Sequence, residues 1–131
     1  MSRCTRHPWL ALVALVACAT ARPRPTSWGD PTAAQGPSLT VAHLEARLLG
    51  RAGPPFPSDD TRTDLHREGR GPLEVGVRVC VADTGALTRL EVVAPSDWPD
   101  LDADAIDTLR GTRYGPGPAG CAVLVLHYRQ L

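Results

Sequence analysis

Three aspartates at every second position, Asp100, Asp102 and Asp104, have the spacing of the first ligands in a calcium-binding loop. Such a loop needs glycine at its sixth position and glutamate at its twelfth, where this chain has Ala105 and Gly111. The carboxylates are better explained by the first turns of a helix, whose positive end favours negative charge. No metal site is predicted.

Catalytic side chains show no local pattern. The histidines that follow the N-terminal region, His43, His66 and His127, are scattered, and no serine or cysteine has a partner base at a motif spacing. Distant residues can still converge in space, so an enzyme stays open as the less favoured alternative. No cofactor is expected. The chain contains no lysine and has no basic patch, which argues against nucleic-acid binding.

The N-terminus has the layout of a secretory signal. Arg3 and Arg6 make it basic, and residues 9–17 form an apolar run without charge. That run is too short to span a bilayer, which takes roughly 20 apolar residues. Residues 1–17 are therefore predicted to be a signal peptide that exports the rest of the chain.

The end of this signal resembles a bacterial lipobox, with Leu15-Val16-Ala17 preceding Cys18. The resemblance implies that the Cys18 thiol carries a diacylglyceryl group and anchors the protein in the cell envelope, facing the periplasm. Ala19 stands where aspartate often signals inner-membrane retention, which favours the outer membrane. The alternative is cleavage by ordinary signal peptidase after Ala19-Thr20-Ala21, which would give a secreted protein without lipid.

Export decides the roles of the cysteines. Cys4 leaves with the signal and Cys18 is lipidated or removed, so Cys80 and Cys121 are the pair left in the folded part. In an oxidising compartment the two are expected to form a disulfide. A free pair or a metal site is the less favoured alternative, because His127 has no second histidine at ligand spacing.

The remaining sequence has room for one domain. Residues 18–37 are rich in proline and small polar residues and are predicted to be a semi-stiff tether that cannot build a packed element. Residues 38–53 are predicted to contain a short helix capped by Ser38 and ended by Gly50. A second helical turn is expected over 59–66.

From Leu73 the apolar period changes to two, which predicts a strand over 73–81, a turn at Asp83-Thr84-Gly85 and a returning strand over 87–93. A helix follows over 99–109, and a last strand over 121–128. The expected fold is α+β: a small three-stranded antiparallel or mixed sheet with one helix on a face. Because the helix makes the third strand parallel to the second, the expected strand order is 2-1-3.

The cysteines predict a register for the first and third strands. If Cys80 lies opposite Cys121, then Leu73 lies opposite Tyr128, and the valines of one strand meet the apolar residues of the other along the whole ladder. A slip of one residue would lose this match.

The order and spacing of several motifs resemble the C-terminal domain of the TonB family, over residues 54–131. The motifs are Pro55-Phe56-Pro57, the hairpin from Val77 to Leu87, the helix start Leu101-Asp102-Ala103-Asp104-Ala105-Ile106, and Arg110-Gly111-Thr112-Arg113-Tyr114-Gly115-Pro116. Two positions depart from the family pattern. Thr112 replaces a tryptophan, and Pro95-Ser96-Asp97 replaces Ser-Ser-Gly.

The resemblance implies a protein-interaction module whose last strand accepts a strand from a partner. The edge residues would be Val123, Val125, His127 and Arg129, and an envelope protein would be the partner, with a homodimer as a further option. The alternative is TonB-type energy transduction, or an accessory role in transport, for outer-membrane receptors. Energy transduction would need an uncleaved membrane helix and a long proline-rich span, which this sequence does not show.

Overall fold

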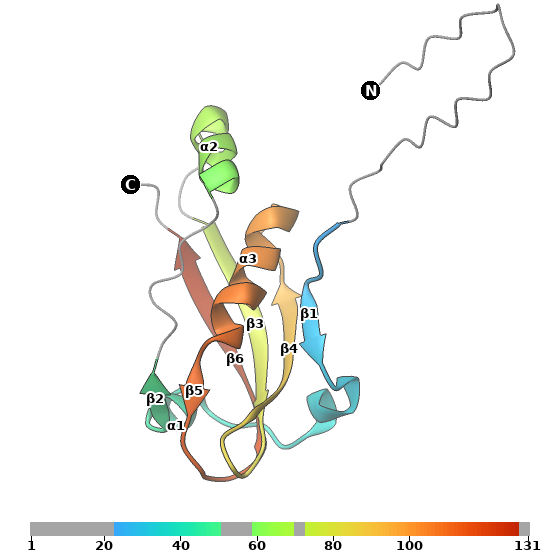
Figure 1. The fold of residues 1–131 in the computed structure, drawn as a ribbon, viewed down its shortest axis with the longest axis vertical. Helices are drawn as coiled ribbons and strands as arrows, with labels where there is room; N and C mark the ends of the chain where they lie inside the picture. Colours follow the sequence, from blue (N-terminus) through green and yellow to red (C-terminus); the bar gives the residue numbers. More distant parts are fainter. Residues whose placement is uncertain (1–22, 51–58, 70–72, 129–131) are drawn as a thin grey trace, which may run out of the picture.

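The computed structural model describes residues 23–50, 59–69 and 73–128. Its main sheet is antiparallel with strand order β1-β4-β3-β6, and a second sheet pairs β2 with β5 (Figure 1). The strands are β1 Ser27–Gly29, β2 Leu48–Gly50, β3 Leu73–Val81, β4 Leu87–Ala94, β5 Arg113–Tyr114 and β6 Gly120–Tyr128. The helices are the 3-10 helix η1 Pro31–Gln35, α1 Val41–Glu45, α2 Asp59–Glu68 and α3 Pro99–Arg110.

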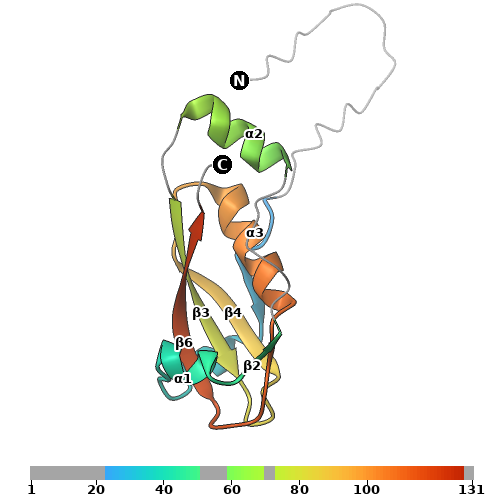
Figure 2. The ribbon, with the colours of Figure 1, turned by 90° about the vertical axis from the view of Figure 1, so that its left-hand side faces the viewer.

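Helix α3 covers one face of the main sheet (Figure 2). The period-two valines of β3 point to that face, and Val75, Val77 and Val79 are at most 1% exposed. From α3, Leu101 and Ile106 join the same core cluster. The mixed α+β class and the strands and helix expected from residue 73 onward are therefore confirmed.

The disulfide and the register are also confirmed. Cys80 and Cys121 are bonded and lie opposite each other in the β3–β6 ladder. Leu73 pairs with Tyr128 at the far end, and no register shift occurs between these two pairs. The apolar alternation of both strands fixes this register, because a one-residue slip would turn every valine of β3 away from α3.

The predicted three-stranded sheet of order 2-1-3 is not matched, because a fourth strand lies outside β4. Strand β1 comes from the segment predicted to be a tether, and Trp28 pairs with Leu90 of β4. The composition of residues 18–37 did not predict β1, because this strand needs no packed core of its own. It adds to the free hydrogen-bonding edge of β4, and prolines are tolerated beside such an edge. At least part of residues 18–37 therefore belongs to the fold.

The first helix is shorter than the sequence predicts. Its N-cap is Thr40, whose hydroxyl accepts from His43 N–H, while Ser38 instead forms a parallel bridge with Cys121. The helix ends at Glu45, and the stretch predicted to be its last turn forms β2, which pairs with β5. Tertiary pairing thus overrides the helical spacing of the leucines. The second helix, α2, begins at Asp59 as expected and extends to Glu68.

The junction between β4 and α3 is formed by Pro95-Ser96-Asp97 and contains a left-handed residue. Asp97 has φ 67°, a left-handed conformation that favours glycine and that aspartate tolerates better than most residues. Next to it, the buried carboxylate of Asp102 accepts from Ser96 N–H at 2.9 Å and from Ser96 Oγ–H at 2.7 Å. This turn therefore has a backbone conformation that glycine adopts readily, and the two hydrogen bonds from Ser96 to Asp102 hold it in place.

Several predictions fall outside the described residues. These are the signal peptide, the lipidation of Cys18, the Pro55-Phe56-Pro57 element and Arg129. In the ranges that the structure does describe, no helix is long and apolar enough to cross a membrane.

Candidate partner-binding edge

Strand β6 ends the main sheet within the described part of the chain, so one of its edges faces outward. The side to which its backbone groups point can be fixed at Cys121. The Cys121 N–H donates to Pro37 O at 2.8 Å, and its carbonyl accepts from Leu39 N–H at 2.6 Å. Both groups of Cys121 therefore point away from β3.

Backbone direction alternates along an antiparallel strand, so every second residue of β6 repeats the orientation of Cys121. The N–H and C=O groups of Val123, Val125 and His127 accordingly point outward. Among the described residues, the segment from Pro37 to Leu39 is bonded to this edge at Cys121, and the strand order places no further strand beyond it. Three of the four predicted edge residues thus have backbone groups that point away from β3, as strand addition requires.

The side chains of these residues lie on the face of the sheet opposite α3. Val123 is 43% exposed and Val125 49% exposed, so this face of the sheet presents two apolar side chains to solvent. His127 Nδ1 lies 3.0 Å from Glu74 Oε1 on the same face, and Arg78 reaches Glu91 at 3.5 Å. The open part of the face is a small apolar patch bordered by these two polar contacts.

A small groove lies beside the same edge on the α3 side, with a volume of about 160 Å³. It is mostly apolar and is formed where α1, β2, β5, the end of α3 and β6 meet, by Val41, Glu45, Leu48, Thr108, Leu109, Thr112, Tyr114, Leu124, Val125 and Leu126. The side chains of an added strand would alternate between this groove and the valine patch.

Arg47, between α1 and β2, bonds to two loops of the chain. Its guanidinium donates to the carbonyls of Gly115 at 3.1 Å and Pro118 at 2.6 Å, and Gly115 N–H donates to Arg47 O at 2.7 Å. A longer contact of 3.5 Å reaches Ala82 O in the β3–β4 hairpin. Arg47 therefore connects the segment after α1 to two loops. Its charge makes these hydrogen bonds stronger than those of a neutral donor.

The carboxylates of α3 serve as structural partners. Asp104 is buried and lies 2.7 Å from Arg24, which also contacts Asp107 at 2.6 Å. Hydrogen bonds to Asp104 and then to Asp107 raise the pKa of Arg24. Burial, followed by the charges of Asp104 and Asp102, raises the pKa of Tyr128, whose hydroxyl has no partner among the described residues. The helix-dipole explanation of the sequence was thus incomplete, because Asp102 and Asp104 also hold specific contacts.

Sequence reasoning missed Arg24, Trp28 and Arg47. Trp28 is half-buried against the core cluster, with the guanidinium of Arg110 5.6 Å from the centre of its ring. The sequence signal for Arg24 and Trp28 was a tryptophan and arginines within a proline-rich stretch, and the three residues of β1 are too few to show a strand period. Compared with family models, with curated proteins and with solved structures, the chain matches none of them.

Proposed function

We propose that the chain is an envelope lipoprotein that carries a TonB C-terminal-like protein-interaction module. A signal peptide exports it, a lipid on Cys18 anchors it facing the periplasm, and the outer membrane is the favoured location. Its partner is an envelope protein that supplies an extended segment to the outer edge of β6. No enzymatic step is part of this proposal.

One observation carries the proposal: the outward backbone groups of Val123, Val125 and His127, bordered by an apolar groove on one face and exposed valines on the other. Main-chain hydrogen bonds supply affinity in strand addition, and pockets for alternate side chains supply specificity. The edge is bounded at Cys121 by the segment from Pro37 to Leu39, so the added strand is a short one.

Proline at Val125 tests the edge. It removes an N–H that points outward, so the ladder with β3 keeps its hydrogen bonds while the added strand loses one and meets the proline ring. We expect Val125→Pro to lower recovery of the partner from an envelope extract at least about tenfold, the size of effect that one lost bond and a steric clash produce. Recovery is measured by quantitative mass spectrometry of the captured proteins.

Val125→Thr is the matched control, because it keeps the N–H and the branched shape of the side chain. It should retain the partner, and the melting temperature of each variant reports whether the fold is preserved. If Val123→Pro and Val125→Pro both fold and both retain the partner, binding does not use this edge.

The lipid anchor has its own test. Cells fed radiolabelled palmitate should label the wild-type protein, and Cys18→Ala should abolish the label because the acceptor thiol is gone. An unlabelled wild-type protein found free in the periplasm would instead support cleavage after Ala21.

A further inference from the structure

The segment of residues 24–36, here called the strap, wraps around the sheet from one edge toward the other. At its start, Arg24 is paired with Asp104 of α3. The strap continues as β1 along the edge of β4 and then crosses the face of the sheet opposite α3 as η1. It ends where Pro37 and Leu39 bond to Cys121 at the opposite edge. Figure 1 shows this path from β1 through η1 toward α1.

The strap is held at its start by contacts to α3 and β4. Arg24 bridges Asp104 and Asp107, and the ring of Trp28 faces Arg110. Two further backbone bonds flank the β1 ladder: Val92 N–H donates to Thr26 O at 3.0 Å, and Asp30 N–H donates to Thr88 O at 2.8 Å.

These contacts bury little of the strap itself. Within β1 only Trp28 is half-buried, and η1 contains no buried residue. Beneath the strap, Arg89 donates to Gly29 O at 3.2 Å, but its Nε is buried without a partner among the described residues. Segments with few buried apolar contacts open at lower free energy than the core, and opening would return the Arg89 Nε to water.

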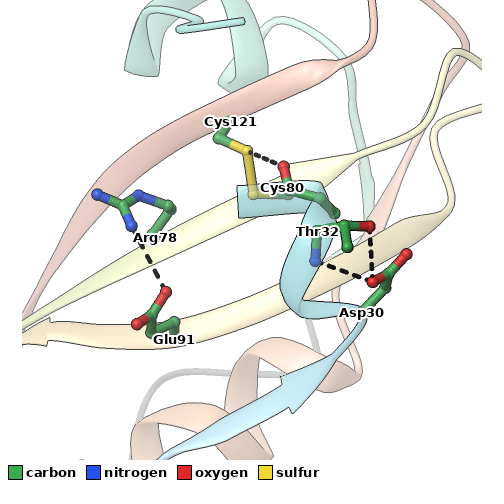
Figure 3. Close-up of a disulfide and its surroundings, with 7 residues drawn as sticks. Asp30, Thr32, Arg78, Cys80, Glu91 and Cys121 are labelled. Carbon is green, nitrogen blue, oxygen red and sulfur yellow. Dashed lines mark hydrogen bonds and ion pairs between the residues drawn. A yellow bond between two sulfur atoms is a disulfide. The ribbon is translucent and has the colours of Figure 1, made fainter. Parts of the chain in front are cut away.

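The disulfide lies directly under the strap (Figure 3). Cys80 is 1% exposed and Cys121 7% exposed, and Ala33 O of η1 lies 3.1 Å from Cys121 Sγ. A disulfide sulfur carries no proton, so this is a packing contact and not a hydrogen bond. A thiolate must reach one sulfur to attack the bond, and η1 occupies the space beside Cys121.

We infer that the strap opens as a unit while β3, β4, β6 and α3 stay folded, and that this opening controls whether the Cys80–Cys121 disulfide can be reduced. The closed strap shields the disulfide, and the open strap exposes both the disulfide and the outer edge of β4. This gating depends on neither lipidation nor partner binding.

The test measures the rate at which dithiothreitol reduces the disulfide in the exported chain carrying Cys18→Ser. Each protein disulfide yields two thiols as dithiothreitol is oxidised, and the thiols are trapped with a maleimide and counted by mass. We expect Arg24→Ala to accelerate reduction about tenfold, because it leaves the buried Asp104 carboxylate without this partner and frees the start of the strap. Trp28→Ala should accelerate reduction in the same direction.

Two controls separate strap opening from global unfolding. Arg62→Ala removes the same charge from an exposed pair with Asp59 in α2 and should leave the rate unchanged. Val77→Ala destabilises the core. If reduction follows strap opening, Val77→Ala lowers the urea midpoint with little change in the rate. The inference is overturned if Arg24→Ala and Trp28→Ala leave the rate unchanged, or if the rates of all variants follow only their global stability.

Discussion

A chain in which alanine replaces both Cys80 and Cys121 should unfold with a free energy about 3–4 kcal/mol lower than that of the oxidised wild type. The disulfide joins residues 41 positions apart, and a loop of that size gives roughly this value in the chain-entropy model. Urea unfolding followed by circular dichroism measures the change, because the midpoint should fall as the unfolded chain gains freedom.

Cys18→Ser is the matched control for this double variant, since it replaces a cysteine outside the disulfide and should leave the free energy of unfolding unchanged. Wild-type protein unfolded in excess dithiothreitol should behave like the double variant, because both lack the cross-link. A double variant within about 1 kcal/mol of the oxidised wild type would show that the ladder between β3 and β6 is sufficient without the covalent bond.

Gly85→Ala should be strongly destabilising for a change of one methyl group, lowering the free energy of unfolding by about 2–5 kcal/mol. Gly85 has φ +88°, which costs an L-residue about 1–2 kcal/mol. Its added Cβ would also lie 2.3 Å from Tyr114 O and 2.5 Å from Gly115 O, and relieving such a clash costs about 1–3 kcal/mol more. Thermal and urea unfolding measure the loss.

Gly69→Ala is the control for backbone conformation alone. Gly69 also has a positive φ, +59°, but an added Cβ would meet nothing within 4 Å. This variant should lose only the conformational part, so the difference between the two variants measures how closely the β3–β4 hairpin packs on the loop at Tyr114. Equal losses would contradict that close approach.

The sequence predicted the central ladder well because two independent signals agreed there. The valines of β3 specify which face is buried, and the Cys80–Cys121 pair specifies the register. Strand β1 was not predicted for a physical reason: its three residues are held by the edge of β4 and by the contact of Trp28 with Arg110 of α3, not by their own pattern. Likewise, Leu48 continued the helical spacing of α1 but pairs with Tyr114, a contact that no local pattern reports.

Part of the candidate site could likewise be predicted from the sequence, and part could not. The alternation of β6 was enough to predict that Val123, Val125 and His127 share one face of the strand. The groove beside them could not be predicted, because Val41, Leu48 and Tyr114 reach it from separate segments. The limit of the edge at Cys121 also depends on a distant segment, Pro37 to Leu39, which the sequence placed partly in a tether and partly in a helix.

The strap limits how far the domain can lie from a membrane to which Cys18 is anchored. A lipid on Cys18 followed by a free tether to residue 37 would let the domain rise about 65 Å, at 3.3–3.6 Å per residue. With Arg24 fixed to Asp104 and Asp107, only residues 19–23 connect Cys18 to the folded domain. The largest distance between Cys18 and the domain then falls to roughly 20 Å. A lipidated domain with a closed strap would therefore sit close to the bilayer, and releasing it would give a threefold longer range from the same anchor.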